Sequence, residues 1–289
     1  MNFIGADSSF EEAGIVMFGA PFDSTTSFRP GTRFGPQAAR SESFGIETYS
    51  PLQDRDLADA AVHDAGDLEL PFGDPAAALG MIEEETARIL SAGKTPFLVG
   101  GEHLVTLGAV RAAAKAHPGL RIIHFDAHAD LRDDYLGARL SHACVMRRCH
   151  DLLGDGRIWQ FGIRSGTREE FEFMKSGRTA AEPFAFSTLP SLRFPPGTPV
   201  YLTVDLDVLD PSEFPGTGTP EAGGARYGEL LGALLDIIAR FRVVALDNVE
   251  LSPNLDPSGR STALACKLLR EELVAVAAAR EAAGGRGGT

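Results

Sequence analysis

The sequence predicts an α/β fold in which helices cover a mostly parallel sheet. Short apolar runs rich in β-branched residues alternate with longer, amphipathic, alanine-rich runs along the chain. This alternation is typical of parallel strands joined by helical crossovers. The 289 residues contain no internal repeat and no long low-complexity linker. We therefore expect one domain over residues 1–289, because α/β folds often reach this length as a single unit.

The alternation resolves into eight expected strands and seven expected helices. The strands are predicted at residues 14–19, 61–65, 96–100, 120–126, 157–163, 183–187, 199–206 and 242–249. The helices are predicted at residues 36–44, 75–92, 103–117, 142–153, 167–176, 226–240 and 258–280. Pro36 suits the first turn of a helix, and Gly93 suits a helix end. The glycine-rich tail at 282–289 predicts a disordered segment.

Charge and cysteine content exclude several classes of function. Forty acidic and 27 basic residues give a net charge of -13, which argues against a nucleic acid or an anionic membrane as partner. No apolar run reaches membrane-spanning length, and the first residues lack the pattern of a secretory signal. The three cysteines show no paired spacing, so neither a zinc finger nor a disulfide framework is indicated. We expect a cytoplasmic protein.

Six side chains of the metal-ligand type stand in or next to apolar runs. They are His103 in VGGEH, Asp126, His128 and Asp130 in IIHFDAHAD, and Asp205 and Asp207 in YLTVDLD. Alternate residues of an extended segment share one face, so each run should present its polar side chains together. Buried carboxylates are costly unless positive charge compensates them. Two divalent ions would balance the roughly four negative charges, and this ligand set, which has no thiolate, favours Mn²⁺.

Two further polar residues are candidates for the chemistry. His142, in RLSHACVMRR, begins a predicted helix, and a histidine there can pass a proton at physiological pH. Glu250, in VVALDNVELSP, ends an apolar strand and could hold a guanidinium through two parallel hydrogen bonds. His124 lies deeper in its strand, where a core role or support of a neighbouring ligand is favoured over metal binding.

Five motifs, in this order along the chain, resemble those of the ureohydrolase family of arginases and agmatinases, and of its agmatinase-type members in particular. They are GGEH, DAHAD, SH, DLDVLDPSEFPGTGTPEAGG and DNVELSP, within residues 19–253. The resemblance implies a three-layer αβα sandwich around an eight-stranded, mostly parallel sheet. It also implies two Mn²⁺ per subunit, a metal-bridging hydroxide that hydrolyses a guanidino group to urea and an amine, and a homotrimer or homohexamer.

The resemblance further implies a role for each site residue. All six residues of the metal-ligand type would contact one or other ion, with Asp126 and Asp205 as the bridging carboxylates. Asp130 would also hold the hydroxide and pass a proton to the departing amine, with His142 as shuttle. Glu250 would orient the guanidinium of a small cationic substrate.

The tail of the substrate is less determined. Arg132 stands where an arginase-like site would have a neutral asparagine, so arginine is disfavoured. Asp133 and Asp134 could attract an amine tail, as in agmatine or aminopropylagmatine, which would yield putrescine or spermidine beside urea. Arg132 could instead bind the carboxylate of guanidinobutyrate. Cys144 follows His142 where many relatives have a Gly-Thr pair, which would alter the pocket slightly.

Two other classes of function remain as alternatives. A deacetylase-like amidohydrolase would use a single zinc ion, but Asp130 and His103 supply ligands for a second ion and argue against it. A non-catalytic relative would bind manganese without turnover.

Overall fold

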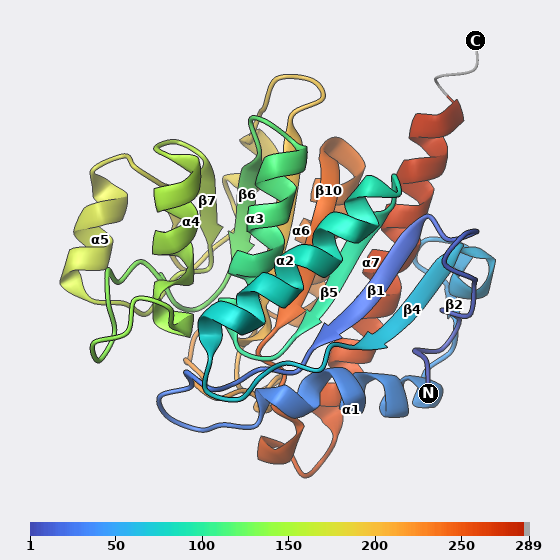
Figure 1. Ribbon diagram of the computed structural model, residues 1–289, viewed down its shortest axis with the longest axis horizontal. Helices are drawn as coiled ribbons and strands as arrows, with labels where there is room; N and C mark the ends of the chain where they lie inside the picture. Colours follow the sequence, from blue (N-terminus) through green and yellow to red (C-terminus); the bar gives the residue numbers. More distant parts are fainter. Residues whose placement is uncertain (286–289) are drawn as a thin grey trace.

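One sheet of eight strands organises the structure, a computed structural model that describes residues 1–285 (Figure 1). The strands are β1 (Ile15–Ala20), β4 (Val62–Asp67), β5 (Thr95–Gly100), β6 (Arg121–Phe125), β7 (Ile158–Phe161), β8 (Ala180–Glu182), β9 (Pro199–Asp205) and β10 (Arg242–Val249). Their order is β4-β1-β5-β10-β9-β6-β7-β8, and every neighbouring pair is parallel.

Helices cover both faces of this sheet. On one face lie α1 (Gly35–Glu42), α6 (Tyr227–Arg240) and α7 (Arg260–Gly285); on the other lie α2 (Pro75–Ser91), α3 (Thr106–Ala116), α4 (Val145–Leu153) and α5 (Arg168–Lys175). Alternate side chains of a strand point to opposite faces, so Met17 of β1 joins one buried apolar cluster and Phe18 joins the other. The expected three-layer αβα sandwich is thereby confirmed.

The prediction of a strand at residues 183–187 is wrong. The edge strand is β8, three residues earlier, and pairs with β7. Phe184 has a φ of 65°, a conformation that breaks an extended strand, and Phe186 packs edge-on against Phe125. The aromatic residues of this segment therefore serve packing and not sheet pairing. A minor antiparallel pair, β2 (Tyr49–Ser50) with β3 (Arg55–Asp56), was not expected.

The predicted disorder of residues 282–289 is wrong at its beginning. Helix α7 continues to Gly285, because its alanines favour helix and Glu281 forms an ion pair with Arg55 at 2.8 Å. Residues 286–289 lie outside the described residues. Neither α7 nor any other helix within residues 1–285 is both long and apolar enough to cross a membrane.

The strand order brings the candidate site together at one edge of the sheet. Strands β5, β10, β9 and β6 are neighbours in the middle of the sheet. Their carboxyl ends precede or carry His103, Glu250, Asp205 and Asp126, respectively. Open parallel sheets bind ligands at this edge, as the sequence predicted.

Candidate metal centre

The first group of polar atoms surrounds His103, in the turn after β5. Its Nδ1 lies 3.1 Å from an oxygen of Asp126, 3.1 Å from one of Asp130 and 3.3 Å from one of Asp205. Nevertheless this buried nitrogen forms no hydrogen bond within residues 1–285. A buried polar atom without a partner is rare and costly. Three carboxylates crowded around an unpaired imidazole nitrogen therefore fit a divalent cation.

The second group surrounds His128. Its Nδ1 lies 2.9 Å from an oxygen of Asp207 and 3.5 Å from Oδ1 of Asp126. Asp126, His128 and Asp207 could hold a metal ion, and so could Asp126 with His103 and His124. Asp126 thus belongs to both groups. The six side chains expected from the sequence therefore converge in two adjoining clusters that share one carboxylate.

The local backbone differs from the extended segment predicted for residues 126–130. Strand β6 ends at Phe125, and Asp130 has a φ of 53°, which non-glycine residues adopt rarely. The loop is held by the carboxylates themselves: the His128 N–H donates to Asp126 Oδ1 at 2.6 Å, and the Ala127 N–H donates to Asp207 Oδ1 at 3.0 Å. The residues converge through loop geometry and not through strand alternation.

The electrostatics show how strongly these carboxylates repel one another. Burial and the negative charge of Asp126 raise the pKa of Asp130 to about 7. Burial and the charges of Asp207 and Asp126 raise the pKa of Asp205 well above its usual value. Burial opposes protonation of His103, but the carboxylates of Asp126, Asp130 and Asp205 around it outweigh burial and raise its pKa. Without a cation, the site therefore retains protons that a metal would displace.

A chain of hydroxyl groups orients His103 from behind, and the sequence reasoning missed it. The Nε2 of His103 lies 3.1 Å from Thr203 Oγ1, and Thr203 donates to Asp247 Oδ1 at 2.6 Å. Tyr201 donates to the other Asp247 oxygen at 2.5 Å. Because the Thr203 proton is directed at Asp247, its oxygen accepts from His103 Nε2. This arrangement leaves the Nδ1 lone pair of His103 facing the carboxylates.

His124 supports Asp126 in a similar manner. Its Nε2 lies 2.8 Å from Asp126 Oδ2, and its Nδ1 lies 3.1 Å from the side-chain nitrogen of Gln160. Burial lowers the pKa of His124, so the neutral ring accepts from Gln160 and donates to Asp126. Both ring nitrogens are engaged, which matches the supporting role favoured from the sequence.

Another buried carboxylate, that of Glu102, connects the loop after β1 to the candidate metal centre. Glu102 accepts from the N–H of Thr25 at 2.9 Å, from the Thr25 hydroxyl at 2.5 Å and from the Thr26 hydroxyl at 3.1 Å. The Thr25 hydroxyl oxygen in turn accepts the N–H of His142 at 3.1 Å. A side chain at Gly101 would lie 2.0 Å from the carbonyl oxygen of Phe22, so glycine is needed for this close approach. The sequence signal for this contact is the GGEH motif, in which the sequence alone assigns no role to the glutamate.

His142 and Glu250 both line the cavity of about 220 Å³ that opens onto the two clusters. Burial lowers the pKa of His142 to about 4, so the imidazole is neutral at pH 7. Its Nε2 lies 3.3 Å from Ser27 Oγ. A neutral imidazole can accept a proton, and the role of His142 as a proton shuttle stays a prediction.

Glu250 presents a buried carboxylate to the same cavity. Its Oε1 accepts the N–H of His103 at 2.8 Å, and its own N–H donates to the Gly101 carbonyl at 2.9 Å. Its φ is 67°, a strained conformation for this residue. Within residues 1–285 no cation pairs with it, and burial and the charge of Glu102 raise its pKa. The cavity thus contains an acid that lacks a positive partner.

Of the four residues predicted to bind the tail of the substrate, one lines the cavity and three do not. Arg132 lines it, with Nε 3.5 Å from Glu170 Oε2 and its guanidinium over the Tyr135 ring at 4.4 Å. The three others lie outside the cavity lining: Asp133 pairs with Arg148 at 2.6 Å, Asp134 accepts the Gly137 N–H, and Cys144 is fully buried. Their sequence position next to the motif did not predict the direction of their side chains.

Comparison with known proteins agrees with this geometry. The sequence model described as "Arginase family" matches residues 13–275. The chain belongs to the arginase family. It is 46% identical over 278 residues to an agmatinase of Bacillus subtilis strain 168, covering 94% of this chain and 95% of that one.

Other arginase-family relatives resemble the chain over similar lengths. An N(1)-aminopropylagmatine ureohydrolase of Thermococcus kodakarensis is 38% identical, with 92% of each chain covered. The crystal structure of the agmatine ureohydrolase of Thermoplasma volcanium superposes with a TM-score of 0.87 at 34% identity, covering 95% of this chain and 94% of that one. The resemblance proposed from the motifs is therefore confirmed over most of the chain.

Proposed function

We propose that this arginase-family enzyme is a manganese-dependent agmatinase, which hydrolyses agmatine to urea and putrescine. The observation that carries the proposal is Glu250, a buried carboxylate that pairs with no cation within residues 1–285, in the same cavity as the two metal-type clusters. A guanidinium would supply the missing charge. The agmatinases and agmatine ureohydrolase among the relatives support this choice of substrate.

Two Mn²⁺ would be held by the six converging side chains, with Asp126 common to both. Bound there, such ions act as Lewis acids and lower the pKa of a coordinated water towards neutrality. The unpaired Nδ1 of His103 and the mutual repulsion of Asp126, Asp130 and Asp205 support this assignment. Manganese is preferred because the ligands are oxygen and imidazole and include no thiolate.

The remaining residues bind the substrate and move the proton. Glu250 orients the guanidinium with two charge-assisted hydrogen bonds and keeps it charged. Hydrolysis adds water across a carbon–nitrogen bond, so one proton must travel from the attacking water to the departing amine. Asp130, whose carboxylate lines the cavity, can take that proton and release it. His142 lies on the cavity wall as a neutral acceptor that can relay it.

The tail of the substrate meets the wall that contains Arg132. Glu170 and the face of Tyr135 engage this arginine, so its charge is partly compensated, which favours a substrate without a carboxylate. Guanidinobutyrate is the second candidate because Arg132 still lines the cavity. Arg132→Ala should change the ratio of activities on agmatine and guanidinobutyrate and leave the metal content unchanged.

The test is urea release from agmatine, aminopropylagmatine, guanidinobutyrate and arginine, each with manganese present. Agmatine should give the highest kcat/KM, and Glu250→Gln should lower it strongly while two metal ions per chain remain. Absence of urea from all four substrates would reject the proposal. One tightly held zinc per chain, with amide hydrolysis, would favour the deacetylase-like alternative instead.

We also propose that the enzyme acts in the cytoplasm as a single-domain homotrimer or homohexamer. Its acidic net charge of -13 supports a small cationic substrate and not a nucleic acid or an anionic membrane. Light scattering of the purified protein will measure the number of subunits.

A further inference from the structure

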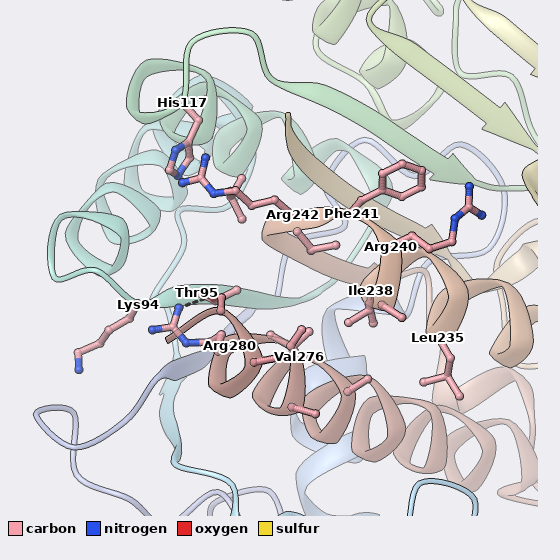
Figure 2. Close-up of a pocket in the computed structure, with 18 of the residues that line it drawn as sticks. Lys94, Thr95, His117, Leu235, Ile238, Arg240, Phe241, Arg242, Val276 and Arg280 are labelled. Atoms are coloured by element: carbon pink, nitrogen blue, oxygen red, sulfur yellow. Dashed lines mark hydrogen bonds between the residues drawn. The ribbon is translucent and has the colours of Figure 1, made fainter. Parts of the chain in front are cut away.

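A second, larger cavity lies at the end of the sheet opposite the metal centre. It measures about 880 Å³ and is formed where β5 and β10 begin, beside the carboxyl-terminal parts of α6 and α7 (Figure 2). Strands β5 and β10 run from this cavity at Thr95 and Arg242 towards His103 and Glu250. None of the candidate metal-site residues lines it. The two cavities are therefore separated by the length of the sheet.

The wall of this second cavity is largely aliphatic. Side chains from α6, β10 and α7 form it: Leu235, Ile238, Val243, Val244, Ala275, Val276 and Ala279. Small-molecule sites are concave, mostly apolar and roughly 300–1,000 Å³ in volume. The second cavity has this size and character. Its concave shape suits a small ligand better than a flat protein surface.

The ionisable side chains around the aliphatic wall are all of the basic type. Lys94, His117, Arg240, Arg242 and Arg280 line the cavity, and no aspartate or glutamate does. This composition is opposite to that of the whole chain, in which 40 acidic residues exceed 27 basic ones. The electrostatic potential inside the cavity should therefore favour an anion.

Not all of these basic groups are available to a ligand. Arg240 pairs with Asp236 and donates to two backbone carbonyls. The ammonium of Lys94 donates to the carbonyls of Glu11 and Ala13. Both cations are already engaged, which leaves Arg242 and Arg280 as the lining arginines available to a ligand.

Arg280 and Arg242 have no acidic partner within the part of the chain that the structure describes. Arg280 is held in place by neutral acceptors, the Thr95 hydroxyl at 2.8 Å and the Gly93 carbonyl at 3.1 Å. Arg242 lies beside His117 on the opposite wall (Figure 2), and its charge, after burial, lowers the pKa of His117. Both arginines are exposed at the cavity, Arg280 is held by neutral acceptors, and neither guanidinium pairs with a carboxylate of residues 1–285.

We propose that this second cavity binds an amphipathic organic monoanion, with an aliphatic body against the apolar wall and a carboxylate head near Arg242 and Arg280. Guanidinium groups bind carboxylates through paired hydrogen bonds. The aliphatic wall explains why a hydrocarbon body, and not a simple inorganic anion, suits the site. The inference is independent of the reaction at the metal centre.

The experiment is calorimetric titration of the full-length, manganese-loaded protein with decanoate, decylammonium and sulfate. Decanoate should bind saturably at one site per chain. Sulfate, which has the charge without the hydrocarbon, should bind at least tenfold more weakly, and decylammonium should not bind. Equal binding of decanoate and decylammonium would overturn the proposal, as would absence of decanoate binding. These comparisons use only the wild-type protein.

A matched pair of variants locates the site. The double variant Arg242→Met/Arg280→Met removes the charges, keeps aliphatic bulk and should weaken decanoate binding at least tenfold. Arg193→Met is the control, because Arg193 is an exposed arginine that donates only to backbone carbonyls and lies outside the cavity. Equal weakening in both variants would refute the assignment.

Two further measurements accompany the titrations. Urea release by the double variant should stay at the wild-type level, which separates this site from the catalytic one and shows that the variant is folded. Light scattering with and without decanoate should give the same mass. A loss of subunits on adding decanoate would instead identify the cavity as an interface between copies, and would reject the small-ligand site.

Discussion

Replacement of Thr203 by valine tests whether the buried chain behind His103 determines metal affinity. Thr203 is fully buried on β9, with its hydroxyl between His103 Nε2 at 3.1 Å and Asp247 Oδ1 at 2.6 Å. Valine has nearly the same shape and an equal preference for strands. The substitution therefore removes one hydroxyl group from the chain and leaves the packing in place.

The magnitude follows from the two groups that lose a partner. An unpaired buried polar group costs about 1–3 kcal/mol, and the change leaves His103 Nε2 and one Asp247 oxygen without their partner. Asp247 still accepts from the Tyr201 hydroxyl at 2.5 Å. We therefore expect the free energy of unfolding to fall by roughly 2–4 kcal/mol in total. Removal of a group that orients a metal-binding histidine lowers metal affinity about 10–100-fold.

The assay is competition between the protein and a fluorescent chelator for manganese, together with denaturant unfolding. Thr86→Val is the control, because Thr86 is also fully buried but donates to the Ile82 carbonyl within α2. The control should keep its manganese affinity. Wild-type affinity in Thr203→Val, with a normal unfolding transition, would refute the proposed orientation of His103.

Three further predictions concern charge. Asp126→Asn should lower manganese content and reduce urea release more than about 100-fold, beyond the loss expected for an outer partner, because both clusters share Asp126; full metal content by elemental analysis would contradict this. Manganese affinity should increase from pH 6 to pH 8, because the pKa of Asp130 is raised to about 7 and its proton must leave; calorimetry in buffers of different ionisation enthalpy should detect proton release, and a pH-independent affinity would argue against it. Burial raises the pKa of Glu272 to about 8, so the folded state favours its protonated form. Its contribution to stability is full below about pH 4.5 and is lost as the pH rises to about 8. Glu272→Gln should therefore reduce the decline in the free energy of unfolding between pH 5 and pH 8 by up to a few kcal/mol, as measured by urea unfolding. An unchanged decline would exclude Glu272 as its source.

Much of the fold followed from apolar periodicity. The central strands are buried on both faces, so their sequences are continuous apolar runs that are easily recognised. The edge strand β8 (Ala180–Glu182) was misplaced because its sequence is short and exposed, whereas the aromatic segment after it resembled a strand but packs as a turn. Propensity does not separate these cases, since packing partners decide them.

The site was predictable to the extent that its residues stand next to strand ends. His103, Asp126, Asp205 and their neighbours converge because parallel strands end at one edge of the sheet. The direction of a loop side chain was not predictable in this way, and Asp133 points to Arg148 instead of the cavity. The roles of Thr203 and Glu102 depend on contacts between distant segments, which no local pattern encodes.

The Glu102 contacts have a consequence for protein engineering. The rim of the candidate site is assembled from three stretches of chain that are remote in sequence: the loop of Thr25 and Thr26, the GGEH turn and the start of the segment at His142. A loop graft over residues 21–29 that brings no hydroxyl side chain to positions 25 and 26 would leave Glu102 without its two hydroxyl donors and the N–H of His142 without its acceptor. Altered selectivity in this scaffold therefore requires that the three stretches be exchanged as one unit.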